Sequence, residues 1–169
     1  GISDYQTGLS PLPSAIADVE AMKRILIHPE MGDFRAGNVT VLKNPQKQVM
    51  EEKIEDTFTS LKSDDLILFY FSGHGIKDDR GNFFLATATT RKSSTGDLKK
   101  STAVSSTFLH NRMQESRSQH QAVVLDCCFS GAIAKGMTIK NDGSINLKAH
   151  LGGKGRAVLT SSTSTEYSF

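Results

Sequence analysis

Residues 66–75 read LILFYFSGHG, and this stretch decides the fold class. Its first six residues are continuously apolar, which is typical of a strand that is buried on both faces of a sheet. The polar, glycine-flanked tip at residues 72–75 follows without a break. Residues 122–131, AVVLDCCFSG, repeat the arrangement. Two core strands therefore deliver polar side chains at their carboxyl ends, which is the edge of an open α/β sheet where ligands bind.

Helical segments alternate with strands along the rest of the chain. Hydrophobic spacings of three and four predict helices over residues 14–26, 44–61 and 106–116, with Ser14 capping the first and Pro45 opening the second. The side chains expected to face inward are Ile16, Val19, Met22, Ile25 and Leu26, then Val49, Met50, Ile54, Phe58 and Leu61, and finally Phe108, Leu109 and Met113. This alternation is typical of an α/β fold.

The remaining segments are shorter strands and polar loops. Further strands are expected at residues 39–42, 83–86 and 156–160, and Gly1-Ile2 is expected to end a strand that began earlier. Residues 87–101 are polar and predict a long surface loop, and residues 136–155 predict a long mobile loop.

Composition and charge exclude several classes of function. The chain has 169 residues and therefore forms one domain, and its net charge of +2 gives no electrostatic case for binding nucleic acid. Its longest apolar run, residues 66–71, is far shorter than the roughly 20 residues of a membrane span. The only cysteines in the sequence, Cys127 and Cys128, are adjacent and cannot cross-link distant segments. We therefore expect a soluble, cytoplasmic protein without a disulfide framework.

Cys128 and His74 have the surroundings that covalent catalysis needs. Cysteine is nucleophilic as the thiolate, and a nearby histidine supplies the proton transfers. Both residues follow a buried strand, and nearby glycines let a substrate backbone approach. A lone cysteine at a strand end is more often an inert core residue, which is the interpretation we give to Cys127, because strand alternation directs it to the opposite side.

The motifs at residues 72–75 (Ser-Gly-His-Gly) and 126–131 (Asp-x-Cys-x-Ser-Gly) together resemble those of the caspase and metacaspase cysteine peptidases, including the orthocaspase type. His74 and Cys128 lie 54 positions apart, close to the roughly 50 of caspases. Residues 12–22 also resemble the family's first helix. The resemblance covers nearly the whole chain, and it implies a caspase-haemoglobinase-like three-layer sandwich with a mainly parallel six-stranded sheet. Residues 1–169 would carry the first five core strands and lack the last helices and strand.

The resemblance also implies the roles of the reacting groups. Cys128 would attack the scissile carbonyl and form an acyl-enzyme, while His74 would protonate the leaving amine and then activate water. The backbone N–H groups of Gly75 and Cys128 would hold the oxyanion, with glycine at position 75 keeping the approach open.

The substrate pocket of metacaspases and their bacterial relatives uses an Asp on the first helix, the Ser of the histidine motif and the Asp two residues before the nucleophile. Asp18, Ser72 and Asp126 match these three positions. Two carboxylates favour a cationic side chain, so we expect protein or peptide substrates that are cleaved after Arg or Lys. Two departures from the family pattern, Phe129 in place of a frequent His and Ala15 in place of a pocket Cys, remove no reacting group.

No cofactor and no metal site are expected. The histidines other than His74 lack ligand spacing, and adjacent cysteines make poor tetrahedral ligands. Many metacaspases need calcium, but Asp78, Asp79 and Asp97 do not have a spacing typical of a calcium site, so calcium dependence stays open.

Self-processing is a further hypothesis. Lys135, Lys140 and Lys148 lie in residues 132–155, and basic residues on an exposed loop are what the expected pocket would accept.

Alternatives remain open at this point. The main one is a catalytically silent caspase-like scaffold or regulatory binding module, against which the intact His74 and Cys128 argue. Another is a different cysteine hydrolase that acts on small molecules. Asp126 also has a structural interpretation as a turn cap, and Asp18 as a partner of the helix dipole. The sequence does not predict the oligomeric state.

Overall fold

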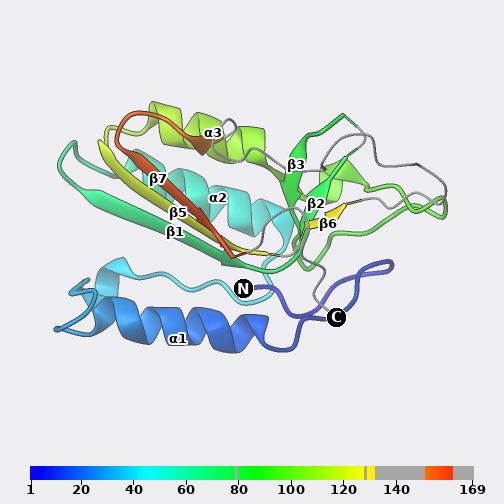
Figure 1. Cartoon of the computed structure of the whole chain (residues 1–169), viewed down its shortest axis with the longest axis horizontal. Helices are drawn as coiled ribbons and strands as arrows, with labels where there is room; N and C mark the ends of the chain where they lie inside the picture. Colours follow the sequence, from blue (N-terminus) through cyan, green and yellow to red (C-terminus); the bar gives the residue numbers. More distant parts are fainter. Residues whose placement is uncertain (79, 128, 132–150, 162–169) are drawn as a thin grey trace.

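Three parallel strands form the centre of the protein. The computed structural model describes residues 1–78, 80–127, 129–131 and 151–161. Strands β1 (Leu66–Ser72), β5 (His120–Asp126) and β7 (Arg156–Thr160) lie in the order β1-β5-β7 (Figure 1). In the parallel register of β1 and β5, Leu66 lies opposite His120 and Ser72 opposite Asp126. The carboxyl ends of both strands therefore meet at one edge of the sheet.

Helices cover both faces of this sheet. Helix α1 (Ala15–Ile27) lies on one face, and α2 (Lys47–Thr59) and α3 (Ser106–Glu115) lie on the other (Figure 1). The core fills the second interface, where the sheet contributes Ile67, Phe71, Val123 and Leu125, and the helices contribute Met50, Ile54, Phe58, Leu109 and Met113. Each such side chain contributes roughly 1.5–3 kcal/mol through burial. The expected three layers and α/β class are confirmed.

A second, smaller sheet adjoins the first and was not predicted. Its order is β4-β3-β2-β6, with β2 (Gly75–Lys77), β3 (Phe83–Leu85), β4 (Val104–Ser105) and β6 (Phe129–Gly131). Strands β3 and β4 pair antiparallel and β2 pairs parallel with β6. Because β2 follows β1 after only Gly73 and His74, these two residues lie at the junction of the two sheets. Two short 3-10 helices, η1 (Ala36–Asn38) and η2 (Lys100–Thr102), complete the described elements.

Three predicted details of the helices are wrong. Ser14 has helical dihedral angles (φ −76°, ψ −23°) and makes no side-chain capping bond, since an N-cap requires extended backbone. Ile25 is 48% exposed because the buried stripe of α1 runs through Ala15 and Val19. Val49 is 47% exposed because it lies about 100° round the helix from the buried Met50.

The strand predicted at residues 39–42 is absent from the ladders of the described residues. This segment instead flanks Gly1, whose amino group donates to the Leu42 carbonyl (2.9 Å), while the Asn44 N–H donates back to the Gly1 carbonyl (2.9 Å). On the other side, the Ile2 N–H donates to the Ser72 carbonyl (3.0 Å). Gly1-Ile2 thus lies between β1 and residues 39–42 and bonds to both, without forming a ladder with either.

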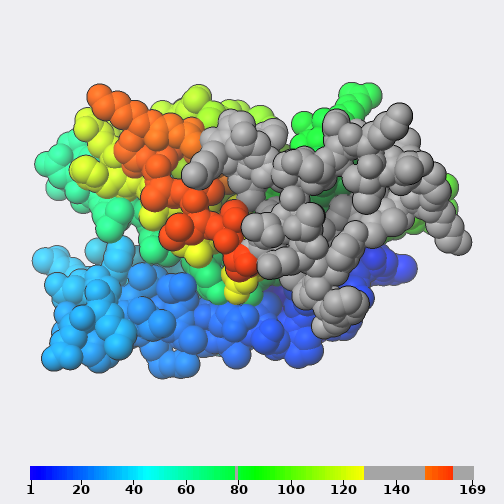
Figure 2. Space-filling view, viewed as in Figure 1, coloured from blue at the N-terminus to red at the C-terminus, as the bar shows by residue number. Residues whose placement is uncertain are grey.

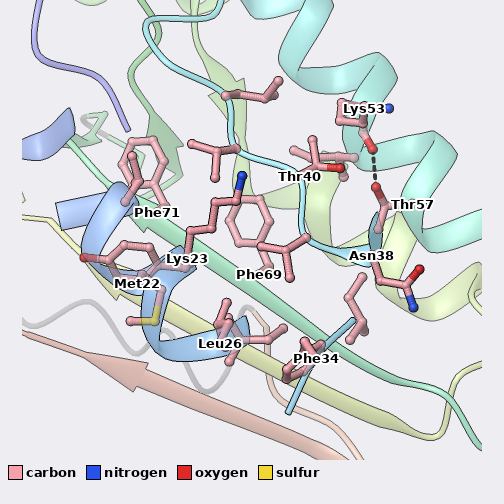
Figure 3. Close-up of a pocket in the computed structure, with 18 of the residues that line it drawn as sticks. Met22, Lys23, Leu26, Phe34, Asn38, Thr40, Lys53, Thr57, Phe69 and Phe71 are labelled. Carbon is pink, nitrogen blue, oxygen red and sulfur yellow. Dashed lines mark hydrogen bonds between the residues drawn. The ribbon is translucent and has the colours of Figure 1, made fainter. Parts of the chain in front are cut away.

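A cavity of about 620 Å³ runs along β1 on the side away from β5. Figure 3 shows Met22 and Leu26 of α1, Phe34, and Phe69 of β1 around it. The cavity explains why β1 is less buried than its apolar sequence predicts. Leu66 is 54% exposed, since β1 has a paired strand on only one side within the described part of the chain.

The loop predicted at residues 87–101 is anchored more deeply than expected. Thr87 and Thr90 are fully buried, and their hydroxyls both donate to the Thr102 carbonyl (2.9 and 2.7 Å). A buried hydroxyl needs such a partner, so this network ties the loop to η2. The compositional signal of a polar stretch does not distinguish this arrangement from a solvated loop. No helix in the described ranges is long and apolar enough to cross a bilayer.

The turn at residues 78–82 depends on the Asp78 carboxylate. It accepts hydrogen bonds from the backbone N–H groups of Arg80 (3.0 Å) and Asn82 (2.8 Å), and it pairs with the Lys100 amine. Burial works against its ionisation, but the side-chain hydrogen bonds from Asn82 and Lys100, followed by those backbone bonds, outweigh it and hold the pKa of Asp78 at about 2.

Asp78→Asn is expected to lower the free energy of unfolding by about 1 kcal/mol at pH 7 and by much less at pH 2. The folded pKa lies below the unfolded value of 3.8, so the contribution of the carboxylate is present above that value and is lost as the pH falls through about 2. Denaturant unfolding of both proteins at several pH values measures the difference. A difference that does not change with pH would contradict the role of the carboxylate charge.

Candidate active site

His74 lies at the junction of β1 and β2, with its two ring nitrogens in different surroundings. Its Nε2 lies 2.8 Å from the Ser10 carbonyl oxygen. A carbonyl only accepts, so Nε2 must carry the hydrogen. Nδ1 is buried and has no hydrogen-bond partner among the described residues. In the neutral imidazole, Nδ1 therefore holds the lone pair that can take a proton.

Burial keeps the imidazole neutral. Desolvation lowers the pKa of His74 below its usual value; the bond to Ser10 works in the opposite direction, and the positive charge of Lys92 lowers the pKa further. At neutral pH, His74 is thus a base rather than an imidazolium, which is the state in which it can accept a proton from a thiol.

Tyr5 contacts His74 through both its ring and its hydroxyl. The two ring centroids lie 4.8 Å apart at an interplanar angle of 49°. The Tyr5 hydroxyl accepts a hydrogen bond from the His74 backbone N–H (3.0 Å) and donates one to the Ile2 carbonyl (2.9 Å). This contact was not predicted, because Tyr5 lies 69 positions before His74 and no sequence pattern links the two.

The glycines beside His74 are required by packing. A Cβ on Gly73 would lie 2.8 Å from the Phe71 ring and 3.0 Å from the Tyr5 hydroxyl oxygen. A Cβ on Gly75 would lie 2.7 Å from the Phe83 ring and 3.2 Å from the Cys127 sulfur. A side chain at either position would therefore collide with the protein's own side chains.

An acidic cluster lies on the α1 side of the sheet edge. The Ser72 hydroxyl donates to Oδ2 of Asp18 (3.2 Å), and Ser72 lies opposite Asp126 in the β1–β5 ladder. The structure thus brings together the three side chains predicted to form the substrate pocket. They come from α1, β1 and β5, so no local pattern in the sequence places them in contact.

Tyr70 is a further member of this cluster, and it was not predicted from the sequence. Its hydroxyl donates to Oδ2 of Asp126 (3.3 Å). Burial, then the charge of Asp126 and its hydrogen bond, raise the pKa of Tyr70 to about 12, so the phenol remains a donor at neutral pH. Strand alternation offered a signal, because residues two apart on a strand share a face, and Ser72 follows Tyr70 by two.

Cys128, the predicted nucleophile, lies outside the described residues, and so do its thiol and its contribution to the predicted oxyanion hole. Two parallel ladders hold the described residues on either side of it, Asp126 and Phe129. Ser72 lies opposite Asp126, and Gly75 lies opposite Phe129. Both pairs are 54 positions apart in sequence, the same separation as His74 and Cys128.

Cys127 belongs to the core, as predicted, with 2% of its surface exposed. Within the described ranges, no group of three or more His, Cys, Asp or Glu side chains is placed to hold a metal ion. Of the acidic residues considered for calcium, Asp78 is engaged by its own turn and by Lys100, Asp97 accepts from Thr95 (2.6 Å), and Asp79 is not described.

The fold and the site define an α/β sandwich with a buried histidine and an acidic cluster at the carboxyl edge of its parallel sheet. The family model described as Caspase domain matches residues 1–168, and the chain belongs to this family. Members of the family are largely cysteine peptidases, and a caspase domain implies the caspase fold. No curated protein matches the chain.

Proposed function

We propose that this chain is a cysteine endopeptidase of the metacaspase or orthocaspase type that hydrolyses peptide bonds after Arg or Lys. Two observations support the proposal. Family membership suggests cysteine peptidase activity. The acidic cluster of Asp18, Ser72, Tyr70 and Asp126 supports the choice of substrate, because it lies at the same sheet edge as His74.

In the proposed mechanism, His74 accepts the thiol proton of Cys128 at Nδ1, and the thiolate attacks the scissile carbonyl carbon. The backbone N–H groups of Gly75 and Cys128 stabilise the oxyanion, each on the order of 10²- to 10³-fold in rate. His74 then protonates the leaving amine, which departs and leaves an acyl-enzyme. A water molecule, deprotonated by His74, hydrolyses the thioester and restores the thiol. The bond between Nε2 and Ser10 keeps the ring in the tautomer that these steps need.

Charge supports the preference for a basic residue. Two carboxylates, Asp18 and Asp126, lie close to the hydroxyls of Ser72 and Tyr70 at this edge. Each hydroxyl bond uses Oδ2 of its carboxylate, and Oδ1 of neither has a hydrogen-bond partner among the described residues. Two such oxygens suit the several N–H donors of a guanidinium or ammonium group, while an Asp side chain would be repelled.

Peptides that release a fluorophore after Arg, Lys or Asp test the proposal. We expect turnover of the Arg and Lys peptides only, and a roughly 10- to 100-fold loss of kcat/KM for them in Asp126→Asn. Glu20→Gln is the matched control, since Glu20 also lies on α1 but points away from Asp18 and pairs with Lys43. Cleavage after Asp would refute the proposed pocket. A correctly folded protein that cleaves none of the peptides, with or without calcium, would favour the silent scaffold.

Self-processing in residues 132–155 remains part of the proposal on grounds of charge alone. Lys135, Lys140 and Lys148 lie outside the described residues. Protein or peptide substrates with a basic residue before the scissile bond are the expected partners.

A further inference from the structure

We propose that Tyr5 is a positioning residue for His74, which fixes the backbone and the imidazole of His74 for proton transfer and shields the ring from water. The inference rests on the proposed function of His74 as the acid and base. It follows from a juxtaposition of side chains that belong to distant parts of the sequence.

The Tyr5 hydroxyl bridges two backbone segments. It donates to the Ile2 carbonyl (2.9 Å) and accepts from the His74 N–H (3.0 Å). Because burial raises the pKa of Tyr5 well above its usual value, the phenol keeps the hydrogen that it donates. The Cβ position of Gly73 lies only 3.0 Å from the same oxygen. The hydroxyl thus fits closely against the turn that carries the catalytic side chain.

The Tyr5 ring and the Ser10 carbonyl hold the imidazole from different directions. The ring packs against the imidazole at 4.8 Å between centroids, while Ser10 bonds to Nε2 (2.8 Å). Both contacts come from the segment at residues 3–10. One segment therefore fixes the orientation of His74 and excludes water from one side of its ring.

This segment is itself anchored on both sides of Tyr5. Before it, Asn44 accepts from the Ser3 N–H (2.8 Å) and donates through its amide nitrogen to Asp4 (3.1 Å). Asn44 has a φ of 48°, a conformation that asparagine tolerates better than most residues. After it, the Lys92 N–H donates to the Thr7 carbonyl (3.2 Å). Tyr5 is thus held in place independently of His74.

Two substitutions separate the functions of the ring and the hydroxyl. Tyr5→Phe keeps the ring and removes the bridge, so we expect kcat to fall roughly fivefold with KM unchanged. Tyr5→Leu also removes the aromatic shield, so we expect a loss of about 10- to 100-fold in kcat. Better hydration of the imidazole should then move its pKa upward toward 6.5.

The test measures the pKa of His74 by NMR of the histidine ring protons in Cys128→Ala protein, with the signal assigned through His74→Gln. The titratable and charged groups that the described residues place around His74 are Tyr5 from the amino-terminal segment and Lys92 from the loop after β3. Lys92→Met serves as the control for the effect of charge, and thermal unfolding is measured for every variant. Kinetics of the same substitutions in the active protein give kcat and KM.

The inference predicts that Tyr5→Leu raises the pKa of His74 and moves the acidic limb of the pH–rate profile with it, while Tyr5→Phe lowers kcat alone. It is overturned if both variants keep the pKa and kcat of the parent protein and only unfold at lower temperature. If Tyr5→Leu does not fold, the kcat and KM of Tyr5→Phe decide. If the parent protein cleaves no peptide, the proposed function fails, whereas the NMR titration still shows whether Tyr5 controls His74.

Discussion

Replacing His74 with Ala is expected to lower kcat for cleavage after Arg or Lys by about 10²- to 10⁴-fold without unfolding the protein. The imidazole is the one side chain in the site with a buried, unpartnered nitrogen among the described residues, and its pKa is lowered by burial. Without it, thiol deprotonation and leaving-group protonation both depend on water. Steady-state kinetics and thermal unfolding of the variant measure the two effects separately.

His120→Ala is the matched control for this experiment, because His120 is exposed at the opposite end of β5. It should retain the activity of the parent protein within about twofold, as surface substitutions usually do. A His74→Ala protein that keeps its activity would remove His74 from the mechanism and leave the fold unaffected. The proposed roles of Tyr5 and Ser10 would then lose their basis as well.

Phe71→Ala is expected to lower the free energy of unfolding by about 3–5 kcal/mol. Phe71 is 2% exposed, belongs to the core between the sheet and α2, and packs beneath Gly73. Removing the ring leaves a void and also removes support from the turn that carries His74. Since domains are typically stable by only 5–15 kcal/mol, the variant is expected to be marginal at 37 °C.

Urea unfolding monitored by circular dichroism measures this loss, with Leu159→Ala as the control. Leu159 is 61% exposed on β7, whose side chains reach the surface (Figure 2), so its truncation should cost less than about 0.5 kcal/mol. Equal effects of the two substitutions would contradict this expectation, since they would show that neighbouring side chains move into the space left by the Phe71 ring.

The long apolar runs were the parts of the fold that could be predicted best from the sequence. The strands at residues 66–71, 122–125 and 156–160 and the three helices are all present, because each has a strong periodic or continuous apolar pattern. Residues 39–42 have the composition of a strand but only Gly1-Ile2 beside them. Strand composition alone does not supply a neighbour, and pairing is what makes a strand.

The residues of the candidate site were also predicted only in part. His74 and the pair of Asp18 and Asp126 were identified from motifs, and the structure brings Asp18 and Asp126 to Ser72. Tyr5 and Tyr70 were not identified, because their roles depend on contacts between segments that are far apart in sequence. Neither lies in a motif, and a tyrosine near a strand has no pattern that separates packing from positioning.

In both parallel ladders the paired residues are 54 positions apart in the sequence. This common separation determines which parts of the chain can change in length. Ser72 and Gly75, which flank His74 in the sequence, are paired with Asp126 and Phe129. An inserted residue within β1 or β5 would shift the register of the pairing and turn every side chain beyond it to the wrong face. An insertion in the intervening loops, such as residues 93–97, leaves both ladders aligned. Length variation in this protein should therefore be tolerated between the strands and excluded within them.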